Sequence, residues 1–406
     1  MNLRSFMLIA GEASGDLLTA ELVSALRAQF SILNPLARRS EAETVPSSPV
    51  FFGAGGPKMA AAGVELAFDM TQHAVIGIPT LKEYFTLRRL FNQLLALAIE
   101  RKPDAVIGVD FGGFNLRFGH AIKQYVRDNP FLKWNPKIIQ FVSPQVWASR
   151  PRRAKLLVAD YDLVLSIFPF EKAWYAQRAP KLRVEFVGHP MIGRFVSSSR
   201  GNEAQTEKKL EPPHVGCYEI LLLPGSRTSE LQKHLPVMLG ALNLIREKMP
   251  VGKTKMILPN EDLKEIADKL SALQSEVEIQ IGDLSNALAE ADLAIASTGT
   301  VTMECAFFGV PTVTLYKTAW FNYAIASRIA TVKWATMPNI LADEEIFPEF
   351  IQSAATPENI AQAALELLQN EARRQKIKAQ LAKIVGALGE AGASRRAATA
   401  ILSLFK

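Results

Sequence analysis

The 406-residue sequence has only two cysteines and five histidines. Cys217 and Cys305 form no C-x-x-C pair and the histidines lack metal-ligand spacing, which argues against a disulfide framework or a structural metal site. No apolar run approaches the roughly 20 residues that a membrane-spanning helix needs, and the first residues do not follow the pattern of a secretory signal peptide. We therefore expect a cytoplasmic protein that touches a membrane, if at all, from its surface.

Neither sign of charge is in large excess, because the chain has 46 Lys and Arg residues and 40 Asp and Glu residues, a formal net charge of +6. This small excess suits an anionic partner such as a nucleotide, a phosphorylated substrate or an anionic membrane surface, although ordinary variation in surface charge explains it equally well. We expect no nucleic-acid partner. Because hydrophobic residues make up 49% of the chain, it is long and apolar enough for two globular domains.

Short apolar segments alternate with helical patterns along the whole chain, which predicts parallel sheets covered on both faces. The predicted strands are residues 6–10, 50–53, 105–109, 137–142, 162–167 and 184–187, then 219–223, 254–258, 277–281, 292–296 and 312–315. We predict two Rossmann-like α/β domains at 1–196 and 215–380, joined by a polar linker at 197–214, with their ligand site in a cleft between them. A carboxy-terminal helix at 381–406 could pack on the first domain of this chain or of a second copy.

Two strand–loop–helix junctions of the second domain carry groups that suit a nucleotide. In "LPGSR", Gly225 allows close approach of the backbone, Ser226 adds a hydroxyl and Arg227 adds a cation, a set that fits a diphosphate at a helix start. An ordinary turn with a surface arginine explains this motif alone equally well.

The second junction is "STGT", which follows a predicted strand and opens a helix. Its candidate ligand residues are Ser297, Thr298, Gly299 and Thr300. Glu304 lies one turn further on the same helical face and is long enough to accept hydrogen bonds from ribose hydroxyls. A solvated helix glutamate is the alternative interpretation.

The first domain carries acids where a phosphate-binding loop would be expected to have none. "GEASGD" at 11–16 contains Glu12 and Asp16, and Asp110 follows a predicted buried strand in "GVDFGGFN". An acid at the carboxyl end of a strand is a candidate general base, whereas an aspartate that caps a turn or helix is the plainer alternative.

The segment "VIGIPTLKEYFTLRRLF" at 75–91 combines apolar and basic residues, which suits contact with acyl chains or anionic lipid. An amphipathic helix packed on the protein core is the alternative, and the two interpretations can both hold. The candidate contact residues are Ile76, Ile78, Phe85, Arg88 and Arg89.

The order of these motifs resembles the lipid-A-disaccharide synthase family. Between residues 6 and about 352 the chain contains "GEASGD", "GAGGPKM", "GVD..GFN", "SPQVWA", "FPFEK", "FVGHP", "LPGSR", "STGTVTMECA" and "MPNILA" in the family's order. The resemblance implies the GT-B fold, in which two Rossmann-like domains face each other across a cleft.

The resemblance also implies a reaction. Such an enzyme transfers diacylglucosamine from UDP-2,3-diacylglucosamine to the 6-hydroxyl of 2,3-diacylglucosamine 1-phosphate (lipid X), inverts the anomeric configuration and uses no metal or other cofactor. Asp110 would be the base, and Arg227 would stabilise the charge on the departing UDP. The enzyme would lie on the inner face of the cytoplasmic membrane and could form a homodimer.

The remaining site residues follow from the same resemblance. Glu12, Ser14, Asp16 and Asn115 would line the sugar side of the site, which would explain the acidic loop because acids accept hydrogen bonds from hydroxyl groups. UDP would lie on the second domain, at Gly225, Ser226 and residues 297–300 with Glu304 on the ribose. Asn339 in "MPNILA" matches a position that the family links to activity.

The chain departs from the family pattern at three places: Gly112-Gly113 replace Pro-Asp, Ser149 replaces a tryptophan, and Glu344 lies where an arginine is frequent. These departures leave two alternatives open. One is another GT-B enzyme, such as a UDP-N-acetylglucosamine 2-epimerase or a MurG-like transferase. The other is a non-catalytic membrane-surface relative. The sequence does not define the length or hydroxylation of the acyl chains.

Overall fold

The computed structural model describes residues 4–33, 49–73, 81–199, 217–271 and 277–405. The chain forms two compact units, residues 1–196 with 388–406 and residues 197–387, which are described separately below. The predicted linker at 197–214 lies almost entirely outside the described residues.

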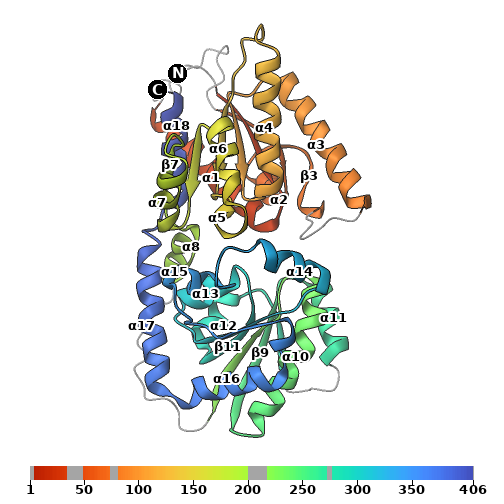
Figure 1. The fold of residues 1–406 in the computed structure, drawn as a ribbon, viewed down its shortest axis with the longest axis vertical. Helices are drawn as coiled ribbons and strands as arrows, with labels where there is room; N and C mark the ends of the chain where they lie inside the picture. Colours follow the sequence, from red (N-terminus) through yellow and green to blue (C-terminus); the bar gives the residue numbers. More distant parts are fainter. Residues whose placement is uncertain (1–3, 34–48, 74–80, 200–216, 272–276, 406) are drawn as a thin grey trace. The chain divides into compact units, whose positions relative to one another are not determined.

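The first unit contains a parallel sheet, seven-stranded among the described residues, in the order β3-β2-β1-β4-β5-β6-β7 (Figure 1). Its strands are β1 (Ser5–Ala10), β2 (Val50–Gly55), β3 (Glu65–Asp69), β4 (Ala105–Val109), β5 (Lys137–Phe141), β6 (Leu163–Ser166) and β7 (Val184–Phe186). Its helices are α1 (Ala13–Leu33), α2 (Pro57–Ala61), α3 (Leu81–Arg101), α4 (Gly112–Asp128), α5 (Val146–Ser149), α6 (Ala154–Asp160), α7 (Pro169–Arg178), α8 (Pro190–Ser199) and α18 (Ala393–Leu402).

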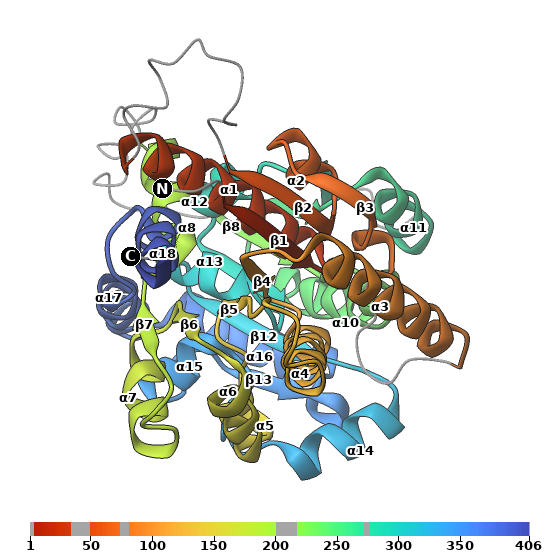
Figure 2. The same cartoon turned by 90° about the horizontal axis from the view of Figure 1, so that it is seen from above.

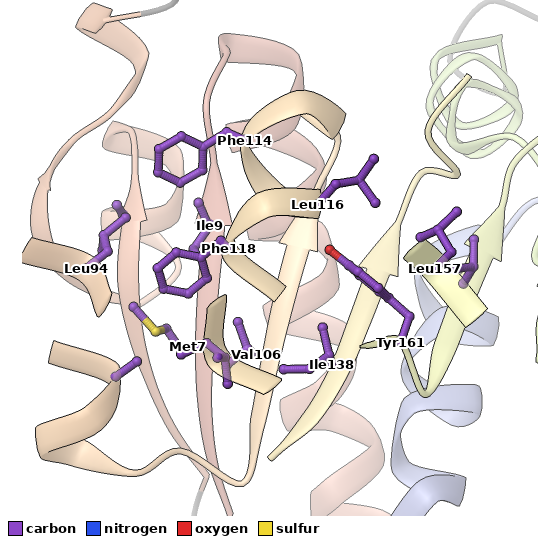
Figure 3. Close-up of a cluster of buried hydrophobic side chains, with 14 of the residues drawn as sticks. Met7, Ile9, Leu94, Val106, Phe114, Leu116, Phe118, Ile138, Leu157 and Tyr161 are labelled. Atoms are coloured by element: carbon purple, nitrogen blue, oxygen red, sulfur yellow. The ribbon is translucent and has the colours of Figure 1, made fainter. Parts of the chain in front are cut away.

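Both faces of this sheet are buried because its strands are apolar at nearly every position. Met7 and Ile9 of β1 point into a core beneath α3 and α4, where the rings of Phe114 and Phe118 stack (Figure 3). The alternate residue Phe6 is also buried, and its ring meets that of Phe405 on the other face. This pattern is typical of strands at the centre of a parallel sheet.

The last residues of the chain return to the first unit. Helix α18 packs along α1, and Figures 1 and 2 show the two side by side. The chain passes from the second unit back to the first at residue 388 and not at the predicted boundary of 381. The reason is that α17 (Glu371–Ala387) belongs to the second unit along its whole length.

The second unit contains a parallel sheet, six-stranded within the described ranges, in the order β10-β9-β8-β11-β12-β13. Its strands are β8 (Tyr218–Leu223), β9 (Val251–Leu258), β10 (Val277–Ile281), β11 (Leu293–Ser297), β12 (Thr312–Tyr316) and β13 (Glu349–Ile351). Its helices are α10 (Thr228–Arg246), α11 (Glu261–Ser271), α12 (Leu284–Glu290), α13 (Val301–Phe307), α14 (Trp320–Ile329), α15 (Met337–Ala342), α16 (Pro357–Gln369) and α17.

The prediction of two doubly wound parallel-sheet domains is confirmed. Each sheet reverses its strand order once, between β1 and β4 in the first unit and between β8 and β11 in the second. The crevice beyond the carboxyl ends of the strands at such a reversal is the usual ligand site of open α/β sheets. The loops that leave these four strands therefore form the candidate ligand sites.

Candidate active site

In the first unit, the loops after β1 and β4 pack directly on each other. Gly11 lies against the ring of Phe111, and a side chain at residue 11 would approach the ring to 2.4 Å. Gly15 packs on the end of β4, where an added Cβ would lie 3.7 Å from the Cβ of Asp110. Because residues 11 and 15 are glycines, the segment that carries Glu12 can lie next to Asp110. The two acids are therefore close enough to interact.

Asp110 has an unusual backbone and an unusual carboxyl group. Asp110 and Phe111 have φ values of 51° and 47°, in the left-handed region that residues other than glycine seldom adopt. Burial, and then the negative charge of Glu12, raise the pKa of Asp110 to about 6, while a hydrogen bond from the Phe111 backbone N–H opposes the shift. A carboxylate with a pKa near neutrality suits a general base.

Three residues predicted to contact the substrate in this unit take different positions. Ser14 is exposed in the first turn of α1, which begins at Ala13, and Glu12 is partly buried beside Asp110. Asp16 is buried, and its carboxylate accepts hydrogen bonds from the backbone N–H groups of Gly56, Lys58 and Met59 at 2.9 to 3.0 Å. Asp16 thus caps helix α2 from outside the helix, and its contact with a sugar stays a prediction.

Asn115, which we also expect to contact the substrate, is buried against the backbone of the loop after β4. Its side chain is 2% exposed and donates through Nδ2 to the carbonyl oxygen of Asp110 at 2.8 Å. Gln140, in the middle of β5, donates to the same oxygen at 2.9 Å. The prediction missed Gln140, although a polar residue inside the apolar run "KIIQF" was a signal for it.

Glu171 is a second residue that the prediction missed. It is fully buried, and its carboxyl group accepts hydrogen bonds from Trp147 Nε1 at 3.0 Å and from the Phe168 backbone N–H at 3.3 Å. Burial raises the pKa of Glu171 to about 7, and these hydrogen bonds oppose the shift. Glu171 thereby holds the "SPQVWA" segment, whose Pro144 packs on Gly112 beside Asp110.

In the second unit, the loop after β8 already binds a carboxylate of its own chain. Gly225 has a φ of 120°, and Glu230 lies against it. Glu230 accepts hydrogen bonds from the Ser226 backbone N–H at 3.2 Å and from Arg227 Nη1 at 2.7 Å. The loop can therefore hold an anionic oxygen, and Glu230 orients the half-exposed Arg227.

The loop after β11 presents an open backbone. Thr298 is partly buried, whereas Gly299 and Thr300 are exposed, and an added Cβ at Gly299 would meet nothing within 4 Å. Glu304 lies partly buried in the first turn of α13, which begins at Val301. Ser297, another predicted ligand residue, is the last residue of β11 and is 2% exposed, with its hydroxyl directed to the Thr298 carbonyl oxygen.

Asn339, another residue that we expect to contact the substrate, has a structural position. Asn339 is fully buried at the start of α15, and both ends of its amide are engaged. Nδ2 donates to the carbonyl oxygen of Phe347 and to Glu349, and Oδ1 accepts from the backbone N–H groups of Ile346 and Phe347, all at 2.8 to 2.9 Å. Asn339 thus stabilises the chain segment that leads into β13.

Among the described residues, no group of three His, Cys, Asp or Glu side chains is placed to hold a metal ion. Asp160 and Asp162, in the sequence "DYD" at 160–162, pair with basic side chains: Asp160 with His120 and Arg127, and Asp162 with Lys123 and Lys137.

Helix α3 carries the described part of the predicted lipid-contact segment. Phe85 is 62% exposed, and Arg88 and Arg89 are exposed beside it. These three side chains line a shallow groove with Asn92, Gln93 and Ala96, all on one face of the helix. Ile76 and Ile78 lie outside the described residues. None of the helices in the described ranges has the length and apolar character to cross a membrane.

Comparison of the whole chain with solved structures finds proteins of the same architecture. A putative UDP-N-acetylglucosamine 2-epimerase from Listeria monocytogenes superposes with a TM-score of 0.58 at 16% identity, over 100% of this chain and 97% of the other. MnaA of S. aureus, solved with UDP, gives a TM-score of 0.60 at 15% identity, over 99% and 97%. At such low identity these neighbours establish the fold alone.

Comparison of sequences is more specific. Lipid-A-disaccharide synthases of Trichlorobacter lovleyi and Nitrosococcus oceani are 32% and 33% identical to this chain over 98% of its length, covering 97% and 96% of their own. The sequence model of the lipid-A-disaccharide synthetase family matches residues 6–403. The chain therefore belongs to the lipid-A-disaccharide synthetase family of glycosyltransferases.

Proposed function

We propose that this member of the family joins two acylated glucosamines, with UDP-2,3-diacylglucosamine as donor and 2,3-diacylglucosamine 1-phosphate as acceptor. Asp110 takes the proton from the acceptor 6-hydroxyl as that oxygen attacks the anomeric carbon from the side opposite UDP. The new glycosidic bond forms as the bond to UDP breaks, and the configuration inverts.

The proposal rests on one observation: the pKa of the Asp110 carboxyl group is raised to about 6. A base in this range is ionised at neutral pH yet basic enough to receive a proton in the transition state. The Gly112-Gly113 departure from the family pattern leaves this acid in place, with Glu12 as its acidic neighbour. The retained base favours a catalytic protein over the non-catalytic alternative.

The second unit supplies the donor end of the reaction. Arg227 and the backbone of the loops after β8 and β11 suit the diphosphate, since fixed cations and N–H groups stabilise a developing negative charge without reorganising. Glu304 accepts hydrogen bonds from the ribose. Because the departing phosphate is neutralised by these groups, the reaction proceeds without a metal ion.

The exposed face of α3 holds the enzyme at the cytoplasmic surface of the membrane, where the acyl chains of both substrates reside. Phe85 supplies apolar contact, and Arg88 and Arg89 supply attraction to anionic lipid.

The test is to incubate the purified full-length chain with UDP-2,3-diacylglucosamine and lipid X, and to identify products by mass spectrometry. The expected products are the disaccharide 1-phosphate and UDP, formed at an unchanged rate when EDTA is added. An epimerised UDP-sugar without disaccharide would instead support the epimerase alternative, and the absence of turnover would contradict the proposal.

A further inference from the structure

Two neighbouring strands of the first unit end in the same rare backbone conformation. At the end of β4, Asp110 and Phe111 have φ values of 51° and 47°, and just after β5, Val142 has a φ of 65°. A β-branched residue such as valine is a particular outlier in this region. Left-handed residues of this kind persist only where surrounding groups hold them, and they cluster at active sites.

One buried amide holds both strand ends. Gln140 is fully buried, and its Nε2 donates to the carbonyl oxygen of Asp110 at 2.9 Å and to that of Val142 at 3.2 Å. Asn115 of α4 donates a second hydrogen bond to the Asp110 carbonyl oxygen at 2.8 Å. A carbonyl oxygen only accepts, so these contacts identify the NH₂ end of each amide.

The other end of each amide is poorly satisfied. Gln140 Oε1 and Asn115 Oδ1 are buried and find no hydrogen-bond partner among the described residues. Buried polar atoms without partners cost free energy, and apolar side chains of the same shape would avoid that cost. Packing alone therefore does not explain why two amides occupy these positions.

Gly108 of β4 provides the room for both amides. A Cβ at residue 108 would lie 2.7 Å from Asn115 Cγ and 2.8 Å from Gln140 Oε1, closer than such atoms can approach. Residues from β4, β5 and α4 thus converge on one carbonyl oxygen, that of Asp110.

We propose that Gln140 and Asn115 are positioning residues, which hold Asp110 in its left-handed conformation so that its carboxyl group points at the acceptor hydroxyl. The inference rests on the proposed role of Asp110 as the base. The direction of the Cα–Cβ bond follows the backbone dihedrals, so relaxation of the strained residue re-aims the carboxyl group. A displacement of about 1 Å at a reacting group can lower a rate on the order of a hundredfold.

The test uses isosteric variants that lack the donors, Gln140→Met and Asn115→Leu, and the double variant. We expect kcat to fall about tenfold to a hundredfold in each, with UDP affinity within about twofold of the wild-type value because the nucleotide loops are untouched. The double variant should lose less than the product of the two single losses, since both amides act on one oxygen. Gly108→Ala, which displaces both amides without removing a donor, should give the same signature.

The matched control is Tyr161→Phe. The buried Tyr161 hydroxyl donates to the backbone carbonyl oxygen of Asn115 at 2.7 Å, and Figure 3 shows it directed at α4. This variant removes a buried hydrogen bond from the same helix without touching the Asp110 carbonyl. It should lower the melting temperature about as much as Asn115→Leu while kcat stays close to the wild-type value.

The pH profile of kcat/KM separates positioning from stability. In the wild type the acid limb should reflect the raised pKa of Asp110, about 6. A carboxyl group released toward solvent and away from Glu12 regains a lower pKa, so the limb should move to lower pH in Gln140→Met and Asn115→Leu but not in Tyr161→Phe. A purely structural role would lower only the melting temperature, and that result would overturn the inference.

The outcomes distinguish this inference from the proposed function. Absence of disaccharide from the wild type would overturn the proposed function. An active wild type whose Gln140→Met and Asn115→Leu variants keep normal kcat and the same acid limb would overturn the inference alone. An Asp110→Asn variant that retains turnover would overturn both the inference and the proposed role of Asp110 as the base. If Gln140→Met does not fold, Gln140→Asn serves instead, because it withdraws the amide from Asp110 by one methylene while keeping the position polar.

Discussion

The loop after β4 and the loop after β8 both lie where the strand order of their sheet reverses, but they are built in opposite ways. The first has left-handed residues other than glycine, fixed by buried side chains. The second obtains its turn from Gly225, whose φ of 120° suits glycine, and leaves Arg227 half-exposed. The contrast is what the proposed roles require, because a base must be aimed at a single atom, whereas a loop that binds a nucleotide needs accessible N–H groups.

The sharpest test of this comparison is Asp110→Asn, which keeps shape and hydrogen bonding but cannot accept the proton. We expect kcat to fall by about a hundredfold or more, since a general base contributes about 10² to 10⁴-fold, while UDP affinity measured by calorimetry stays unchanged. If turnover is retained, Glu12 is the next acid to test, because Asp16 is fully engaged by the backbone.

The same variant should not lose stability. The pKa of Asp110 is raised from 3.8 to about 6 in the folded protein, so its ionisation at higher pH disfavours the folded state. Asp110→Asn removes this cost, and its melting temperature at pH 8 should equal or exceed that of the wild type, with the difference disappearing below about pH 4. A capping aspartate would show the opposite result.

For the loops of the second unit we predict that Arg227→Ala and Glu304→Ala each weaken UDP binding about tenfold or more, because a charge-assisted hydrogen bond contributes about 1.5–3 kcal/mol. Arg373→Ala is the matched control, since Arg373 is also paired on the surface of this unit, with Glu366. Unchanged calorimetric affinity in both test variants would place the nucleotide elsewhere.

For the proposed membrane contact we predict a smaller effect. Replacing Phe85, Arg88 and Arg89 together with Ser should raise KM for substrates presented in anionic vesicles by a few-fold and reduce sedimentation with those vesicles, more so at low salt. Phe131→Ser, at another highly exposed ring of the same unit, is the control. Equal sedimentation of the triple variant and the wild type would exclude this face of α3 as the anchor.

The smallest expected effect is a shift in pH dependence. Glu12→Gln removes the negative charge that helps to raise the pKa of Asp110, so the acid limb of kcat/KM should move to lower pH while the rate at pH 8 changes little. The shift should be partial because burial is the larger cause. A limb that stays in place would show that Glu12 does not interact with the base.

Hydrophobic patterning was enough to predict the central strands and the two-domain division. It missed β3 and β13, which lie at sheet edges and are only partly buried. Their sequences, "ELAFD" and "EFI", lack the continuous apolar run of a central parallel strand.

The polar residues show where sequence patterns stop being informative. Asp16 and Asn339 lie within motifs of the family, but their partners are backbone groups of segments that no local pattern identifies. Gln140 was overlooked because it lies inside a strand and not after one. The motifs indicate which loops lie at the reversals of strand order, while only the fold distinguishes exposed side chains of these loops from buried ones that hold them in place.

The return of residues 388–406 to the first unit has a consequence for synthesis of the chain. The ring of Phe405 packs against that of Phe6, and α18 packs along α1, so one face of the first sheet is completed by a segment that follows the whole second unit in the sequence. Domains generally fold as units during synthesis. The second unit is continuous in sequence, so we expect it to fold once its own residues have been synthesised. The first unit lacks part of its core until residues 388–406 are available, and we therefore expect it to need chaperones more than the second unit does.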